Sequence, residues 1–107
     1  MKNSYYKIVV FVPVVNANDI RKALSSAGAG HIGNYNFCSF STKGIGRFRP
    51  GKDSNPHIGS QGQIEVVEEE RIETICPKEK IKEVIEAVKK VHPYEEPAID
   101  VYELLEI

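Results

Sequence analysis

Residues 81–101, IKEVIEAVKKVHPYEEPAIDV, change their pattern twice and thereby decide the fold. Four apolar residues recur at helical spacing between lysines and glutamates: Ile81, Val84, Ile85 and Val88. This spacing predicts an amphipathic helix that packs its apolar side on another layer. Pro93 disfavours helical geometry at the preceding residue, so the helix should end at His92. Residues 98–106 then alternate as a strand does, so the stretch predicts a helix, a rigid corner and a final strand.

The remainder of the chain supplies one further helix and three further strands. Residues 6–13, YKIVVFVP, are β-branched and aromatic, which favours a central strand, and a helix capped by Asn16 should follow. Residues 35–42 predict a second strand. Residues 63–75 predict a third strand or a strand pair. The broken alternation of this segment indicates a bulge or a stretch that leaves the sheet, and Pro77 opens the last helix. This order is that of an α+β, ferredoxin-like βαββαβ sandwich, with both helices on one face of an antiparallel sheet.

Length and composition fit one domain over residues 1–107. Hydrophobic residues make up 41%, charged residues 27%, and the net charge is -1. Nothing in this balance draws the chain toward nucleic acid or an anionic membrane. The first apolar run is too short to cross a membrane and lacks a signal-peptide cleavage site, and Cys38 and Cys76 form no CxxC pair. We therefore expect a cytoplasmic protein with reduced thiols that binds neither nucleic acid nor membranes.

The face of the sheet away from the helices is expected to carry apolar side chains. In the predicted strands these are Val9, Phe11, Tyr102 and Leu104. Such a surface is more apolar than a monomer usually exposes. We therefore expect other copies of the chain to cover this face in an oligomer.

Three stretches together resemble a known family. GHIGNYNFCSF at 30–40, GIGRFRPGKDSNPHIG at 44–59 and HPYEEPAIDV at 92–101 are similar, in order and spacing, to the inserted domain of the YqfO-type dimetal-binding proteins. The resemblance extends from about residue 5 to the C-terminus. It implies a stand-alone module like the CutA and PII proteins, small ferredoxin-like domains that assemble as homotrimers.

The resemblance does not extend to the chemistry for which the family is named. In the full-length family the two-metal site lies in flanking domains rich in histidine and acidic ligands. The 107 residues contain neither of these domains. Neither a dimetal hydrolase nor a GTP cyclohydrolase activity is therefore implied for this chain.

The corner HPYEEP, residues 92–97, permits two interpretations. His92 with Glu95 or Glu96 could act as a general base or bind a divalent metal ion. Alternatively, the two prolines stiffen the connection while Tyr94 packs its ring and the polar groups form hydrogen bonds. We favour the structural interpretation, because a reaction would need more partners than the sequence shows. His92, Tyr94 and both glutamates remain candidates for contact with a ligand.

The glycine- and proline-rich loop at about residues 43–62 is a second candidate site. Its cations, among them Arg47 and Arg49, suit the binding of a phosphate or a carboxylate metabolite, and His57 lies in the same loop. Residues 46–53, GRFRPGKD, approach the phosphate-loop pattern but lack its hydroxyl residue and a following helix. The alternative is a solvated hairpin or a loop packed between subunits.

A third candidate is the glycine-rich turn that contains His31 and Asn34. Backbone N–H groups in such a turn can hold an anion, although the turn could also serve only to connect the first helix to the second strand. The histidines show no HxxxH spacing. A divalent metal ion would need residues that converge in space, across a subunit boundary if necessary: His31, Cys38, His92 and Glu95.

Three functions follow from these features. The first is a non-enzymatic trimeric module that binds a small anion, metabolite or metal ion at subunit contacts and serves a regulatory or assembly role, with a protein partner as a further possibility. The second is a divalent-metal-binding protein of the CutA kind. The third, and the least favoured, is an enzyme whose site forms between subunits, because no catalytic constellation is recognisable in the sequence.

Overall fold

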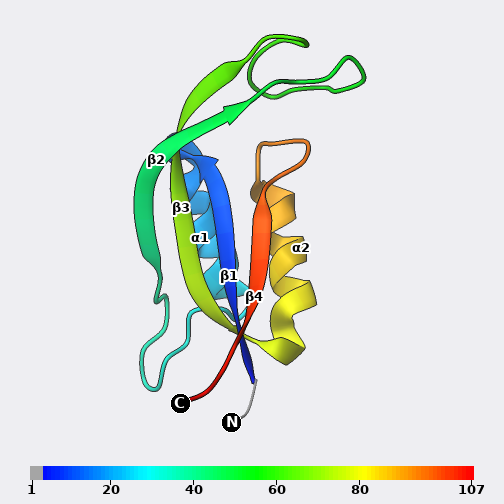
Figure 1. Ribbon diagram of the computed structural model, residues 1–107. Coiled ribbons are helices and arrows are strands. Elements are labelled where there is room, and N and C mark those ends of the chain that lie inside the picture. The colour runs from blue at the N-terminus through cyan, green and yellow to red at the C-terminus, as the bar shows by residue number, and fades with distance from the viewer. Residues whose placement is uncertain (1–3) are drawn as a thin grey trace.

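Two helices and four strands follow one another in the order that the sequence predicts. The computed structural model of the chain describes residues 4–107. The elements are β1 (Tyr5–Pro13), α1 (Ala17–Ser26), β2 (Phe40–Phe48), β3 (Glu65–Pro77), α2 (Ile81–Val91) and β4 (Ile99–Leu104). The strands form one antiparallel sheet in the order β2-β3-β1-β4, and both helices cover the same face (Figure 1). The α+β ferredoxin-like prediction is therefore confirmed.

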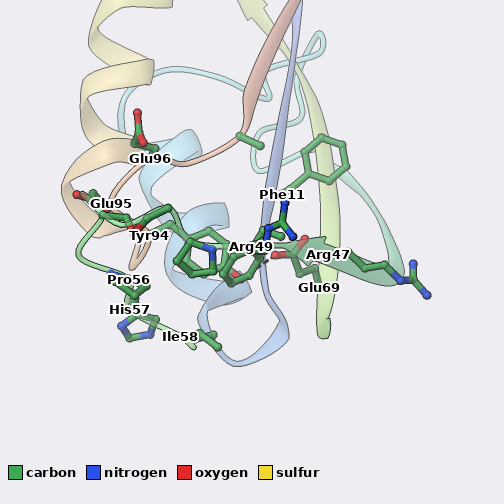
Figure 2. A pocket seen from close by; sticks show the side chains of 16 residues that line it. Phe11, Arg47, Arg49, Pro56, His57, Ile58, Glu69, Tyr94, Glu95 and Glu96 are labelled. Atoms are coloured by element: carbon green, nitrogen blue, oxygen red, sulfur yellow. Dashed lines mark hydrogen bonds between the residues drawn. The ribbon is translucent and has the colours of Figure 1, made fainter. Parts of the chain in front are cut away.

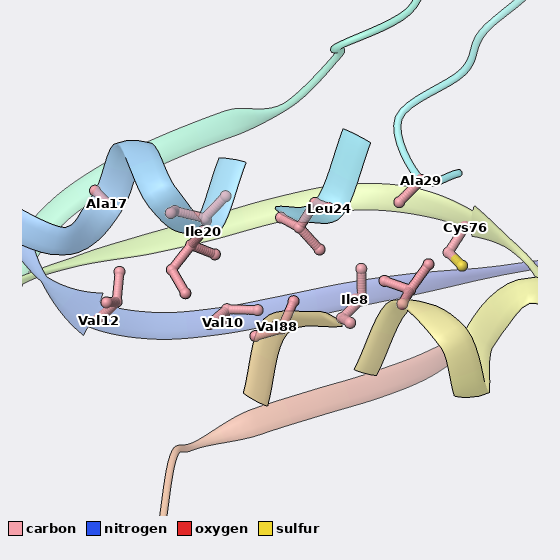
Figure 3. Packing of buried hydrophobic residues seen from close by; sticks show 11 residues of the cluster. Ile8, Val10, Val12, Ala17, Ile20, Leu24, Ala29, Cys76 and Val88 are labelled. Carbon is pink, nitrogen blue, oxygen red and sulfur yellow. The ribbon is translucent and has the colours of Figure 1, made fainter. Parts of the chain in front are cut away.

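The core lies between the sheet and the two helices. Because side chains alternate along a strand, Ile8, Val10 and Val12 of β1 all point toward the helices, where they are fully buried. Val88 of α2 meets them from the other layer (Figure 3), and Val84 of the same helix belongs to the same cluster. Full burial of one such side chain stabilises the fold by about 1.5–3 kcal/mol. The apolar residues that repeat at helical spacing in α2 are therefore the ones that the helix contributes to this core.

Both helices begin through a short turn that the sequence analysis did not predict. Pro13 and Pro77 each end a strand in extended geometry, and a 3-10 turn follows each of them: Val14–Asn16 and Lys78–Lys80. Asn16 precedes α1 but has ψ near 0° and makes no side-chain capping bond, since capping requires extended geometry. No helix within residues 4–107 is long and apolar enough to cross a membrane.

The second strand lies five residues later than predicted. Residues 35–42 were expected to form it, but Phe37 adopts a left-handed φ of 60° and Cys38 donates its N–H to the Gly30 carbonyl, which folds this segment into a turn. Residues 40–48 pair with β3 instead, and the loop is therefore 49–64 rather than 43–62. Pairing with β3 overrides the glycine content that indicated a loop.

The broken alternation in residues 63–75 marks a stretch that leaves the main sheet. β3 keeps a continuous register with both neighbours, so no bulge is present. Its pairing with β1 ends where Pro13 meets Glu69, and residues 65–68 pair with β2 alone. The two strands continue as a ribbon that carries loop 49–64 beyond the end of β1, in a molecule 46 Å long (Figure 1).

The sheet face away from the helices carries both apolar and charged side chains. Tyr102 is 49% exposed, and Phe11 and Leu104 are partly exposed, but Val9 is only 1% exposed within one chain. Val9 lies between Glu73 of β3 and an aspartate of β4 in the register. Charged side chains thus share this face with apolar ones, among them Phe40 of β2, which lies opposite Glu73 and is 67% exposed.

Candidate functional site

A cavity of about 410 Å³ opens where loop 49–64 folds over the corner between α2 and β4. The ends of β1, β2 and β3 form its floor. Figure 2 shows residues from these segments facing one another around it. Six of the predicted site residues line the cavity: Arg47, Arg49, His57, Tyr94, Glu95 and Glu96. The tertiary structure thus joins two stretches, the loop and the corner, that the sequence presents as separate candidates.

A buried carboxylate lies inside this cavity. Glu69 of β3 is 9% exposed, and its Oε2 accepts a 2.7 Å hydrogen bond from the Tyr94 hydroxyl. Burial, together with the neighbouring carboxylate, raises the pKa of Tyr94 well above its usual value, so the phenol remains a donor. Gly46 passes beside the carboxylate so closely that a Cβ there would overlap it. The glycine therefore creates the space that Glu69 occupies.

Tyr94 is also the centre of an aromatic cluster. Its ring meets Phe48 edge to face at a centroid distance of 5.7 Å and lies 6.4 Å from the His57 ring. Edge-to-face pairs of this kind add about 0.5–1.5 kcal/mol to the burial of the rings. Phe48 belongs to β2 and His57 to the loop, so Tyr94 joins both to the corner.

His92 stabilises the corner instead of facing the cavity. The backbone N–H of Tyr94 donates to its Nδ1 at 3.1 Å, so the neutral ring carries its proton on Nε2 and donates to the Phe11 carbonyl at 2.7 Å. Burial lowers the pKa of His92, which favours this neutral form. Both ring nitrogens are therefore engaged within the corner, as the structural interpretation of HPYEEP requires.

Loop 49–64 is held in place by its own hydrogen bonds and by one bond to the corner. Gly62 donates its N–H to the Pro50 carbonyl at 2.7 Å, which closes the loop at its base. The Asn55 N–H donates to Glu95 Oε2 at 3.0 Å. Glu95 thus has a partner in the loop, whereas Glu96 lines the cavity and is exposed to solvent.

Two arginines at the end of β2 bring positive charge to the cavity. Arg49 and Arg47 flank Phe48 at the end of β2 and are both exposed. In Figure 2 the Arg47 side chain extends outward, whereas Arg49 lies on the side of Phe11 and Glu69. Arg49 is therefore the cation best placed to reach a molecule in the cavity.

The predicted turn site lies elsewhere. His31, Asn34 and Cys38 belong to the segment between α1 and β2, at the end of the sheet opposite loop 49–64 (Figure 1). The proposed metal set of His31, Cys38, His92 and Glu95 is therefore not assembled in one chain. Within the described residues no group of three or more histidine, cysteine or acidic side chains could hold a metal ion.

The sequence analysis missed Glu69. Three consecutive glutamates, Glu68, Glu69 and Glu70, have the composition of a solvated surface, but only Glu68 is exposed. Glu70 points toward the helices, where Arg21 of α1 meets it at 2.7 Å, and Glu69 points to the other side and into the cavity. The phase break in this strand was the one signal available, but which glutamate has which partner depends on the register with β1 and β2.

The chain is similar to one part of several longer proteins. No protein-family model matches it. Two curated proteins called "GTP cyclohydrolase 1 type 2 homolog" are similar: that of Halalkalibacterium halodurans is 54% identical over 101 residues and that of Bacillus subtilis 50% over 96 residues. The alignments cover 94% and 90% of this chain but 27% and 26% of those proteins. The chain thus spans about a quarter of the length of the curated relatives it matches.

Solved structures that resemble the chain include one longer protein and two of similar length. A Bacillus cereus protein related to NIF3 superposes with a TM-score of 0.82 at 52% identity, over 95% of this chain and 26% of that one. The periplasmic divalent cation tolerance protein CutA of Archaeoglobus fulgidus gives 0.69 at 22% identity, and the two chains cover each other by 95% and 85%. The B. subtilis GlnK–ATP complex gives 0.64 at 18% identity, with 97% and 84% covered. CutA and GlnK therefore share the fold of this chain.

Proposed function

We propose that this chain forms a non-enzymatic, trimeric module that binds a small anionic metabolite in the cavity between loop 49–64 and the corner. The main observation that supports this proposal is the cavity, because six of the predicted site residues line it. Its volume lies in the range of small-molecule sites, and its walls combine aromatic rings with a few polar groups, as such sites do.

The anionic end of the ligand is assigned to the arginine side of the cavity. Arg49 carries a planar group with several fixed donors, which suits a carboxylate or a phosphate. His57 lies across the opening, on the wall that Tyr94 forms. Tyr94, Phe48 and Phe11 offer an apolar surface for the body of the ligand.

The outer sheet face supports the trimer. Phe11, Tyr102 and Leu104 lie there with part of their surface exposed, and a second copy would cover them. Phe11 also lines the cavity, so the ligand site adjoins the face that we propose is covered. The trimer is the assembly that the CutA and PII resemblance implies.

The binding role is favoured over catalysis by the state of the titratable groups. His92, the best candidate for a base, has both nitrogens engaged and does not line the cavity. The Tyr94 phenol is a hydrogen-bond donor with a raised pKa. Neither group is poised to move a proton to or from a ligand at neutral pH.

Two measurements test the proposal. Light scattering at micromolar concentration should give three times the 12.0 kDa chain mass, and a single-chain mass would contradict the trimer. Titration calorimetry with pyrophosphate and 3-phenylpropionate should show binding that Arg49→Gln weakens about tenfold, since a charged hydrogen bond is lost. Lys52→Gln, in the same loop but outside the cavity, is the matched control. Equal affinities of the wild-type and Arg49→Gln chains for these two ligands would refute the proposed anion site.

A further inference from the structure

One oxygen of the buried Glu69 carboxylate has no partner. Oε2 accepts from Tyr94, but within residues 4–107 no group donates to Oε1 and no cation forms an ion pair with this carboxylate. Glu69 lines the cavity, so a molecule bound there can reach it. Oε1 is not fully buried, so water or a bound ligand can donate to it from the cavity. The free cavity therefore presents an acceptor that one phenol satisfies only in part.

The surroundings hold this carboxylate in place. Tyr94, on the corner, donates to it, and Gly46, on β2, leaves room for it. Two segments of the chain, the corner and β2, thus converge on one acidic group of β3. A carboxylate on an exposed surface is hydrated by water and needs neither of these neighbours. Its neighbour Glu70 illustrates the structural alternative, because Arg21 meets it directly at 2.7 Å.

We propose that the ligand carries a protonated nitrogen that donates to Glu69, in addition to the acidic group that Arg49 receives. The inference rests on the proposed function and extends it, because the ligand is then a small zwitterion whose two charged groups lie on one side of an apolar body. The rings of Phe48 and Tyr94 contact that body. Arg49 and Glu69 select the two groups by charge, and a simple anion satisfies only one of them.

Three probes of one shape test the charge pattern. Phenylalanine carries both charges, 3-phenylpropionate lacks the ammonium group, and phenethylamine lacks the carboxylate. Calorimetry on the full chain should show that phenylalanine binds most tightly of the three. In Glu69→Gln, which keeps an acceptor for Tyr94, the preference for phenylalanine over 3-phenylpropionate should fall about tenfold. Glu68→Gln removes the same charge from the neighbouring exposed residue and should keep the preference.

The outcomes separate this inference from the proposed function. If 3-phenylpropionate binds as tightly as phenylalanine to the wild-type chain, or if Glu69→Gln keeps the full preference, the cationic end is refuted and the anion site stands. If none of the three probes binds at millimolar concentration, the cationic end is refuted, and the anion site is refuted with it only if pyrophosphate also fails to bind. The comparison of the three probes on the wild-type chain needs no variant. The inference can therefore be refuted even if the Glu69→Gln chain does not fold.

Discussion

Gly46 and Gly44 provide a matched pair of substitutions that tests the architecture of the cavity. Both glycines lie in β2, and neither has a positive φ. A Cβ on Gly46 would overlap the Glu69 carboxylate, whereas a Cβ on Gly44 would meet no atom within 4 Å. Gly46→Ala should therefore displace Glu69 from the Tyr94 hydroxyl, and Gly44→Ala should change nothing in the cavity.

The expected magnitude follows from these contacts. A hydrogen bond to a charged group contributes about 1.5–3 kcal/mol, and displacement of Glu69 forfeits it. Replacing glycine by alanine within a strand gains about 0.5–1 kcal/mol, and that gain is common to both variants. Gly46→Ala should thus be about 1.5–3 kcal/mol less stable than Gly44→Ala. For a chain of this size, that difference lowers the melting temperature by at least about 5 °C.

Urea unfolding followed by circular dichroism measures this difference directly. The Tyr94→Phe variant isolates the hydrogen bond, and the Gly46→Ala substitution should cost little more in that background because the bond is already absent. Equal stabilities of Gly46→Ala and Gly44→Ala would refute the account of Glu69 as a carboxylate held by Tyr94 in a space left by glycine.

Two further predictions concern groups with shifted pKa values. Burial lowers the pKa of His92 from 6.5, so the unfolded chain binds more protons than the folded chain at acid pH. The free energy of unfolding should therefore be at its full value above pH 6.5 and should fall below that pH, more steeply than in His92→Gln. An identical slope in the two proteins would contradict this role of His92. His31→Gln is the control, because that side chain is exposed. Burial raises the pKa of Cys76 to about 11, so at pH 8 a thiol reagent should label Cys38 first and Cys76 only on unfolding. Equal labelling rates in the native protein would exclude a buried Cys76.

The sequence was most informative where one local pattern coincided with one layer of the structure. Val84 and Val88 repeat at helical spacing and are fully buried against β1, so periodicity alone located α2. It was least informative around β2, where glycine content indicated a loop and aromatic residues indicated a strand. Gly44 and Gly46 lie in the strand because they pair with β3, whereas the hydrogen bond from Cys38 to Gly30 holds Phe37 in a turn.

The candidate site shows the same division. Residue type was sufficient to select Arg49, Tyr94 and His57, and the cavity joins all three. The sequence favoured a structural role for the corner but did not show the partners of His92, which are backbone groups of Phe11 and Tyr94. It also did not distinguish Glu69 from the glutamates on either side.

The amino-acid sequence by itself determined the order of the elements, the helical face of the core and the chemical types available for binding, because these depend on periodicity and composition within short segments. The tertiary structure alone decided that loop 49–64 and the corner share one cavity and that Glu69 faces into it. The physical reason is the register of antiparallel strands. A shift of one residue sends a side chain to the opposite face, and long-range pairing fixes that choice.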